Sequence, residues 1–213
     1  INMGYKTEKT PVDSFAVKVQ VKGLQGGHSG DDINKGRANA NKLLNRFLTQ
    51  LASKYILYLC EIDGGNLHNA IPREAQALCA VPMKDKESVR VDLNIYTAEL
   101  ENEYAATEPN LRTELSSESP CKEAIDMTTA GHLLRAVYAV HNGVYAMSQD
   151  IPGLVETSSN LASIKQVEGN KIKIVTSQRS SILSSRKNMS EMIRSAFLLG
   201  GAEVITGDGY PGW

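Results

Sequence analysis

Cysteines, long apolar runs and an excess of one charge are scarce or missing in this sequence. The chain of 213 residues has three cysteines, Cys60, Cys79 and Cys121, and their spacing matches no metal-binding motif. An odd number of cysteines argues against the disulfide framework of a small secreted domain, so we expect reduced cytosolic thiols. No apolar run approaches the roughly 20 residues of a membrane-spanning helix. The sequence therefore predicts a cytoplasmic protein without a membrane partner.

The charge balance excludes a further class of partner. Lys and Arg total 23 and Asp and Glu total 24, which gives a formal net charge of −1. A chain of this kind has no overall basic field to attract nucleic acid or an anionic membrane surface. Apolar residues form 41% and charged residues 22% of the sequence, which is typical of a globular protein with a buried core.

The motifs of a complete catalytic centre are missing as well. A site with two zinc ions needs about five His, Asp or Glu ligands, commonly with a His-x-Asp motif and a carboxylate base. None of the four histidines is followed two residues later by aspartate, and the sequence has no Glu-Glu pair. It also lacks a Gly-x-Ser-x-Gly turn, a P-loop and a dinucleotide-binding fingerprint. The chain alone is expected to be catalytically inactive.

A glycine-rich turn with a single histidine stands out in the stretch GLQGGHSGDDINKGRANANKLLNRFL, residues 23–48. Glycines on both sides of His28 allow positive φ angles and the close approach of a ligand. A neutral imidazole there can donate its N–H to a carbonyl oxygen that gains negative charge. The alternative is a loop histidine that is satisfied by neighbouring backbone groups. Ser29, Asp31 and Asp32 are interpreted as capping residues of the following helix, not as metal ligands.

Two further polar side chains lie at the ends of expected strands. Asn69 precedes a strand, where an amide can donate to a carboxylate, although without further context a turn-capping role is the favoured alternative. Arg179 follows a strand among hydroxyl side chains, a setting that suits bidentate binding of a carboxylate. The alternative for Arg179 is a solvated arginine with a surface partner.

Hydrophobic periodicity predicts an α+β fold with an antiparallel sheet and helices packed on one face. Residues 15–120 contain patterns of strand, helix, strand, strand, helix and strand, which is the split-βαβ, or ferredoxin-like, order. The first helix is expected to bury a stripe of apolar residues: Ala40, Leu43, Leu44, Phe47, Leu48 and Leu51. A short edge strand is expected between Pro109 and Pro120.

Residues 121–213 are expected to form a second half, and a duplication of the first half is an open alternative. A helix is expected to present Leu133, Leu134, Val137, Tyr138 and His141. Strands at 154–167 and 171–177 are joined by a turn at Glu168-Gly169-Asn170. A helix around residues 189–197 ends at Gly200-Gly201, and a last strand covers residues 202–206.

Several stretches taken together resemble the Xaa-His dipeptidases, also called aminoacyl-histidine dipeptidases, of the dizinc amino- and carboxypeptidase clan. They are the glycine–histidine–helix stretch at residues 23–48, DGGNLHNAIPREA, VETSSNLASI, QRSSILSS and the terminal GYPGW. The resemblance covers residues 15–213 in the right order. In such enzymes a lid domain is inserted into a zinc-bearing catalytic domain, and this chain resembles the lid alone.

The resemblance implies a role for each candidate residue. His28 matches the lid histidine that stabilises the tetrahedral oxyanion formed from the scissile carbonyl. Asn69 and Arg179 match positions that hold the C-terminal carboxylate of a dipeptide substrate. Asn160 also matches the family, either as a substrate contact or as a strand-end hydrogen-bonding residue. The two zinc ions would be bound by residues outside this chain.

The resemblance also implies an organisation for the chain. Residues 1–14 would be an incoming linker from the missing catalytic domain, followed by the two lid halves at 15–120 and 121–213. Ile1 in place of an initiator methionine and the turn-rich end agree with a segment of a longer protein. The expected partners are a dipeptide, the catalytic domain and a second copy bound through the lid, unless a doubled lid buries that surface internally. The alternative function is a stand-alone ferredoxin-like interaction or regulatory module.

Overall fold

The structure, a computed structural model, describes residues 1–207. The terminal Gly-Tyr-Pro-Gly-Trp sequence, which contributes to the family resemblance, lies outside the described residues.

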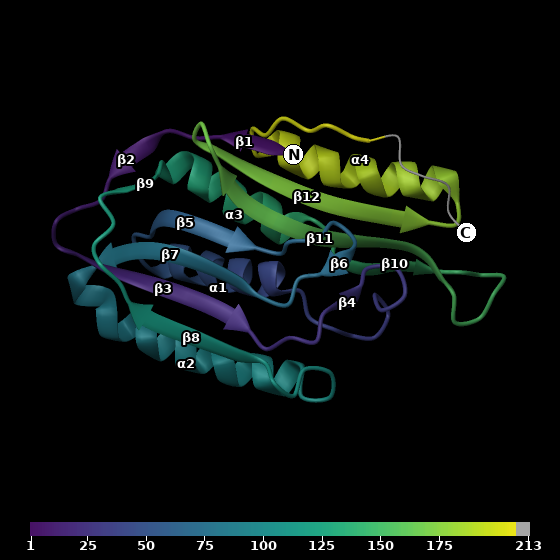
Figure 1. Ribbon diagram of the computed structural model, residues 1–213, viewed down its shortest axis with the longest axis horizontal. Helices are drawn as coiled ribbons and strands as arrows, with labels where there is room; N and C mark the ends of the chain where they lie inside the picture. Colours follow the sequence, from purple (N-terminus) through teal and green to yellow (C-terminus); the bar gives the residue numbers. More distant parts are fainter. Residues whose placement is uncertain (208–213) are drawn as a thin grey trace.

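An eight-stranded antiparallel sheet forms the main layer of the molecule (Figure 1). Its strand order is β1-β12-β11-β5-β7-β3-β8, and β10 pairs with the free end of β11. Two short ladders lie outside this sheet, β2 with β9 and β4 with β6. The main-sheet bounds are β1 (Asn2–Gly4), β3 (Ser14–Lys22), β5 (Tyr58–Gly64), β7 (Ala75–Pro82), β8 (Arg112–Ser117), β10 (Gly143–Met147), β11 (Val155–Val167) and β12 (Lys171–Ser180); the ladder strands are β2 (Thr7–Lys9), β9 (Glu123–Ile125), β4 (Gly27–His28) and β6 (Ala70–Ile71).

Four α-helices within residues 1–207 form a second layer on one face of the sheet. They are α1 (Ala40–Lys54), α2 (Lys86–Glu103), α3 (Met127–Ala139) and α4 (Leu183–Leu199), and the short 3-10 helix η1 (Met83–Asp85) precedes α2. Adjacent helices touch in the order α2, α1, α3, α4, which places them side by side in one layer. The predicted α+β fold with helices on one face of an antiparallel sheet is therefore confirmed.

The first half of the chain has the predicted ferredoxin-like order. The elements β3, α1, β5, β7, α2 and β8 follow one another in sequence, and their strands lie in the spatial order β5-β7-β3-β8. The second half extends the same sheet, because β11 pairs with β5 at Ile164 and Lys165. Its elements run β9 (Glu123–Ile125), α3, β10, β11, β12 and α4 within residues 121–207, so the order strand, helix, strand, strand of the first half recurs but is followed by strand and helix instead of helix and strand.

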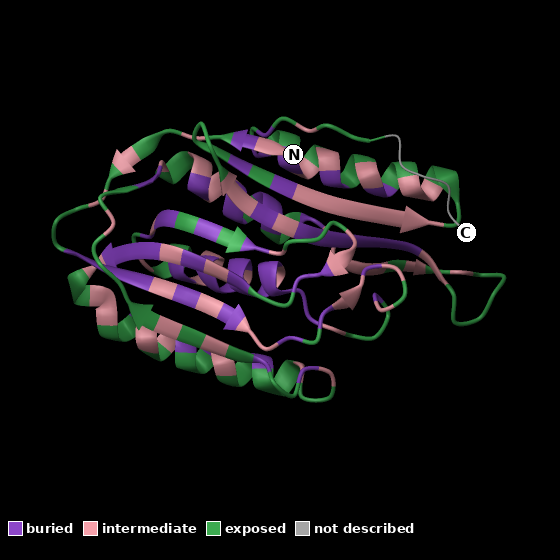
Figure 2. Ribbon diagram, viewed as in Figure 1, coloured by how far each residue is buried: buried purple, intermediate pink, exposed green. Residues whose placement is uncertain are grey.

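The core lies between the sheet and the helices, where the buried residues of both layers meet (Figure 2). The whole predicted stripe of α1 is buried. Phe47 of this stripe stacks on Tyr96 of α2 with ring centroids 5.2 Å apart, and the Tyr96 hydroxyl donates to the Leu43 carbonyl at 2.7 Å. The buried stripe of α1 therefore packs against both the sheet and α2, so that all three share one core.

Lys42 links α1 to the end of α3. Its ammonium donates to the carbonyl oxygens of Val137, Tyr138 and Val140 at 2.7, 2.9 and 2.8 Å. These carbonyls have no partner within a helix that ends at Ala139, so a cation is favourable there. Burial lowers the pKa of Lys42 to about 8.

Some predicted element ends are wrong because tertiary contacts decide them. Tyr138 is exposed and His141 lies beyond the end of α3, where its Nε2 is 3.1 Å from the Val144 carbonyl oxygen. The predicted last strand at residues 202–206 is only a single bridge between Asn2 and Glu203. That bridge brings the two ends of the described chain together.

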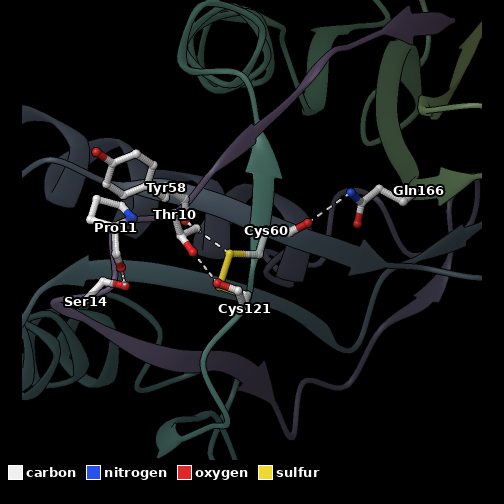
Figure 3. Close-up of a disulfide and its surroundings, with 7 residues drawn as sticks. All are labelled: Thr10, Pro11, Ser14, Tyr58, Cys60, Cys121 and Gln166. Atoms are coloured by element: carbon white, nitrogen blue, oxygen red, sulfur yellow. Dashed lines mark hydrogen bonds between the residues drawn. A yellow bond between two sulfur atoms is a disulfide. The ribbon is translucent and has the colours of Figure 1, made fainter.

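The prediction of three reduced cysteines is wrong for two of them, since Cys60 and Cys121 form a disulfide (Figure 3). Cys60 lies in β5 and Cys121 precedes β9, and the contact between these strands brings together residues 61 positions apart. The Thr10 hydroxyl donates to the Cys121 carbonyl, and Gln166 donates to the Cys60 carbonyl at 3.2 Å. Cys79 is a buried free thiol, and burial raises its pKa to about 12.

Candidate functional site

The segment between β3 and α1 carries His28 and does not run directly into the helix. Helix α1 begins at Ala40, and its N-cap is Asn39, whose side chain accepts from the Lys42 backbone N–H at 3.2 Å. The prediction that Ser29, Asp31 and Asp32 cap this helix is therefore wrong. Asparagine is an equally good capping residue, and the carboxylate of Asp32 is used elsewhere.

Asp32 fixes the turn that presents His28. Its Oδ2 accepts from the His28 backbone N–H at 2.8 Å, and its own N–H donates back to the His28 carbonyl at 3.0 Å. Lys35 donates to the Asp32 Oδ1 at 2.6 Å, and this bond, with the His28 N–H and nearby Arg37, holds the pKa of the carboxyl below its usual value. Gly27 has a φ of +133°, and a Cβ there would collide with Arg37 and Asp32, so this position requires glycine.

The environment of His28 leaves Nε2 as its outward donor. Nδ1 lies 3.4 and 3.3 Å from the backbone nitrogens of Gly30 and Asp31, and 3.0 Å from the Asp31 carboxylate. The tautomer in which Nδ1 accepts from these amides carries its proton on Nε2. Within residues 1–207 Nε2 makes no hydrogen bond. The side chain is partly exposed, so a ligand can reach it.

Asn69 lies beside His28 across a short ladder. His28 pairs with Ala70, and the Ser29 N–H donates to the Asn69 carbonyl oxygen at 2.8 Å. The side-chain amide of Asn69 is half-buried and makes no hydrogen bond within the described part of the chain. It is therefore available to an incoming group next to the imidazole.

Arg179 reaches the same place from the distant strand β12. It lies near the carboxyl end of that strand, opposite Ser158 of β11. A Cβ added to Gly30 would lie 3.2 Å from both the His28 Cε1 and the Arg179 Nη1, so these side chains flank Gly30. In Figure 1, β4, β6 and the end of β12 all lie in the right-hand half of the molecule. The fold thus gathers His28, Asn69 and Arg179 at one edge.

Asn160 occupies a different position from these three residues. It is 1% exposed, its Nδ2 donates to the Ala70 carbonyl at 2.8 Å, and its Oδ1 accepts from Asn39 at 3.2 Å. Both ends of its amide are therefore engaged inside the protein. Asn160 connects the N-cap of α1 to the strand that pairs with His28, and this geometry favours the hydrogen-bonding alternative over a substrate contact.

A large open cleft borders the Arg179 side of this group. Its volume is about 1610 Å³, and its lining includes Gly30, Asp31, His68 and Arg179. Most of the remaining lining comes from β12 and α4, and α4 adds the cationic side chains of Arg186 and Lys187, whereas Arg194 is paired with Glu191 at 3.1 Å. A cleft of this size with cationic groups suits part of a ligand that carries a negative charge.

The residues present do not form a metal centre. No group of three or more His, Cys, Asp or Glu side chains within residues 1–207 is placed to hold a metal ion. The acidic residues nearest His28 are Asp31, which contacts the imidazole, and Asp32, which binds the loop backbone. The zinc ions implied by the resemblance therefore do not fit the described part of this chain. No helix in that part is long and apolar enough to span a membrane.

Comparison with known proteins agrees with this arrangement. Residues 19–108 match the family model of the peptidase dimerisation domain. The chain is 37% identical over 212 residues to the cytosol non-specific dipeptidase of Escherichia coli (strain K12), and the match covers 100% of this chain and 44% of that protein. The crystal structure of aminoacylhistidine dipeptidase from Vibrio alginolyticus superimposes with a TM-score of 0.96 at 35% identity, covering 100% of this chain and 43% of that one.

The chain thus spans less than half the length of either relative. The resemblance to Xaa-His dipeptidases expected from the sequence is confirmed over its whole length. Residues 19–108 thus match the peptidase dimerisation domain, and the chain as a whole is similar in sequence and fold to one segment of each of these two dipeptidases.

Proposed function

We propose that this chain is the lid and substrate-binding domain of a metal-dependent dipeptidase that hydrolyses short peptides, including Xaa-His. The observation that carries the proposal is that His28 and Arg179 flank Gly30, while Asn69 is bound through its backbone carbonyl to the neighbouring Ser29. A hydrogen-bond donor next to a guanidinium and an amide matches the two polar ends of a dipeptide, its scissile carbonyl and its carboxylate.

His28 would act on the scissile carbonyl. When water adds to this carbonyl, negative charge develops on its oxygen, and the Nε2–H of His28 donates to that oxygen. The bond strengthens as charge develops, so it stabilises the transition state more than the substrate. The two zinc ions have no ligand set among the described residues, so we assign their binding to sequence outside this chain.

Arg179 and Asn69 would bind the C-terminal carboxylate. A guanidinium offers two parallel N–H donors to a carboxylate, and the amide of Asn69 can supply another. The small size of Gly30 lets both Arg179 and His28 approach, because a Cβ would crowd them. Because these residues lie close to His28, the C-terminal carboxylate of the substrate must lie close to the scissile bond. This arrangement would restrict the enzyme to short peptides.

Arg179→Met should raise KM for free dipeptides about 10- to 100-fold in the full-length protein, because a charge-assisted hydrogen bond contributes about 1.5–3 kcal/mol. C-terminally amidated substrates lack the carboxylate and should be affected far less. The matched control is Arg194→Met, which removes an arginine from the wall of the same cleft. An equal rise in KM for free and amidated substrates would exclude the carboxylate role of Arg179.

We also propose that the chain is inserted in its catalytic domain, with an incoming segment at 1–14 and lid halves at 15–120 and 121–213. The hydrogen bonds between Asn2 and Glu203, both 2.8 Å, support this proposal because an inserted domain needs its two ends close together. The relative from Escherichia coli is named a cytosol dipeptidase, which supports a cytoplasmic location.

The second proposed partner is another copy of this chain, bound through α2 and β8. Strand β8 is at one end of the sheet, and α2 beside it exposes Val91 and Ile95, each at 55%. An unpaired strand edge next to apolar side chains is suited to pairing between copies.

The double variant Val91→Glu/Ile95→Glu should sediment at half the mass of the wild-type chain in analytical ultracentrifugation, because two buried carboxylates oppose association. Val167→Glu, at an exposed residue at the end of β11, is the control and should leave the mass unchanged. A monomeric wild-type chain, or a double variant that stays dimeric, would rule out this interface.

A further inference from the structure

Glu108 is a buried carboxylate at the base of the segment that carries His28. It is 3% exposed, and within residues 1–207 it forms no ion pair with a lysine, arginine or histidine. Its two oxygens are satisfied by backbone amides instead. Oε2 accepts from the Gln25 N–H at 2.7 Å, and Oε1 accepts from the Ala38 N–H at 2.9 Å.

The two amides that Glu108 binds lie on either side of His28 in the sequence. Gln25 comes just before the glycine turn, and Ala38 comes two residues before the start of α1. Residues 25–38, here called the His28 loop, therefore leave and re-enter the protein core at the same carboxylate. One side chain closes the loop at both ends.

The turn that carries Glu108 also packs against the base of the His28 loop. Gln25 Nε2 donates to the Thr107 carbonyl at 2.8 Å, and a Cβ on Gly36 would be 3.3 Å from the Thr107 methyl group. Just before the loop, Gly23 has a φ of +79°, and a Cβ there would collide with the Asn110 carbonyl. Contacts on both sides of Glu108 show that this turn is built to fit the loop.

Glu108 itself is held firmly behind the loop. Its backbone N–H donates to the Tyr104 carbonyl at 2.8 Å, and its carbonyl accepts from Leu111 at 3.0 Å. Tyr104 is the C-cap of α2, so the position of the carboxylate is set by a helix of the core. The loop is therefore closed by a carboxylate whose position is fixed by α2.

The energetic balance indicates that this carboxylate serves the loop. A buried charge without a cation is costly, and an apolar residue of similar size would avoid that cost. The same apolar residue would leave two backbone N–H groups without acceptors, each at a cost of about 1–3 kcal/mol. Accepting both amides with one carboxylate fixes the relative position of two chain segments, which a pair of separate acceptors would not do.

We propose that Glu108 is a positioning residue that holds the His28 loop closed and thereby sets the place of the imidazole. The catalytic consequence rests on the function proposed above for His28, whereas the closure of the loop does not. Glutamine is the suitable replacement, because it has the same shape but can accept from only one of the two amides and turns an N–H₂ group toward the other.

The first test is amide hydrogen exchange in this chain. Glu108→Gln should speed exchange at Gln25, Ala38 and the residues between them by about 10-fold or more, and leave the strands of the main sheet unchanged. Glu103→Gln is the matched control, since Glu103 is an exposed residue paired with Arg46 and should not affect the loop. Unchanged exchange in the loop of Glu108→Gln would overturn the proposal.

Amide hydrogen exchange in the wild-type chain is a second test, which does not depend on whether the variant folds. The amides of Gln25 and Ala38 should exchange slowly and at similar rates, because one carboxylate holds both. Fast exchange at either amide would overturn the proposal.

A double-mutant cycle in the full-length protein tests the catalytic consequence. Glu108→Gln should lower kcat about 10- to 100-fold with little change in KM, because a displacement of about 1 Å can cost about 100-fold. In a His28→Ala background the same change should alter kcat by less than about 2-fold, since the group it positions is gone. If the double variant instead shows the product of the two single-variant losses in kcat, the positioning role would be overturned. If His28→Ala itself leaves kcat unchanged, the function proposed for His28 fails, and hydrogen exchange still decides the loop closure separately.

Discussion

His28→Ala in the full-length protein is expected to lower kcat by about 10²–10³, the loss seen when one oxyanion donor is removed. The expected loss is in kcat and not in KM, because the bond to the carbonyl oxygen gains most of its strength in the transition state. The structure supports this expectation with an Nε2 that has no hydrogen-bond partner in residues 1–207 and an Nδ1 held by the protein.

The control for this experiment is His68→Ala. His68 is exposed, lies next to Asn69 in sequence and lines the same cleft, but no role in the reaction is assigned to it. It should leave kcat within about 2-fold of wild type. An unchanged kcat in His28→Ala, or a rise in KM alone, would contradict the oxyanion role.

Asn160→Leu is expected to destabilise the chain by about 1–3 kcal/mol, because it removes a buried amide and leaves the part-buried Ala70 carbonyl without its donor. The substitution should also loosen the strand that pairs with His28, since Ala70 is the partner of His28 in the ladder. Urea unfolding measures the effect as a lower midpoint with an unchanged m-value.

Asn188→Leu is the matched control, because Asn188 is exposed on α4 and should change stability by less than about 0.5 kcal/mol. A normal stability of Asn160→Leu together with a raised KM would contradict the positioning role. That result would favour the alternative left open by the sequence, in which Asn160 contacts the substrate.

Local periodicity was sufficient for most of the fold. The apolar stripe of α1 and the alternation in β3 are direct consequences of one buried face, so helix, strand and core could be predicted together. The start of α1 could not, because Asp32 and Asn39 are both good capping residues. Asp32 does not cap the helix because its carboxylate accepts from the His28 backbone N–H instead.

Contacts between distant residues were beyond the reach of local patterns. Cys60 and Cys121 pair only because β5 and β9 touch, and their spacing carries no sign of it. Arg179 meets Gly30 through the register of β12, which no local pattern specifies. The grouping of His28, Asn69 and Arg179 was expected from the family resemblance and not from the residues alone.

Glu108 left no signal in the sequence at all. It is a single glutamate before Pro109 in a turn, a setting in which an exposed residue is the ordinary expectation. Its role became visible only when the structure placed two backbone amides from the His28 loop on its carboxylate. Residues that position a catalytic loop through the backbone are difficult to predict, because the groups they bind are the same in every residue.

The alternative of a stand-alone regulatory module differs from the dipeptidase lid in what should bind at Gly30. A module that acts alone requires no dipeptide at this edge of the molecule. Two relatives that match the whole chain are dipeptidases more than twice as long as the matched segment, which favours the lid.

A crystal structure of the full-length protein with a phosphinic dipeptide analogue is the decisive test of the roles of His28 and Arg179, because the phosphinate copies the tetrahedral oxyanion. We expect the Nε2 of His28, from the same or a partner subunit, about 2.7–3.1 Å from a phosphinate oxygen. We also expect Arg179 and Asn69 to bind the analogue's carboxylate. An analogue bound with His28 and Arg179 facing solvent would contradict these roles.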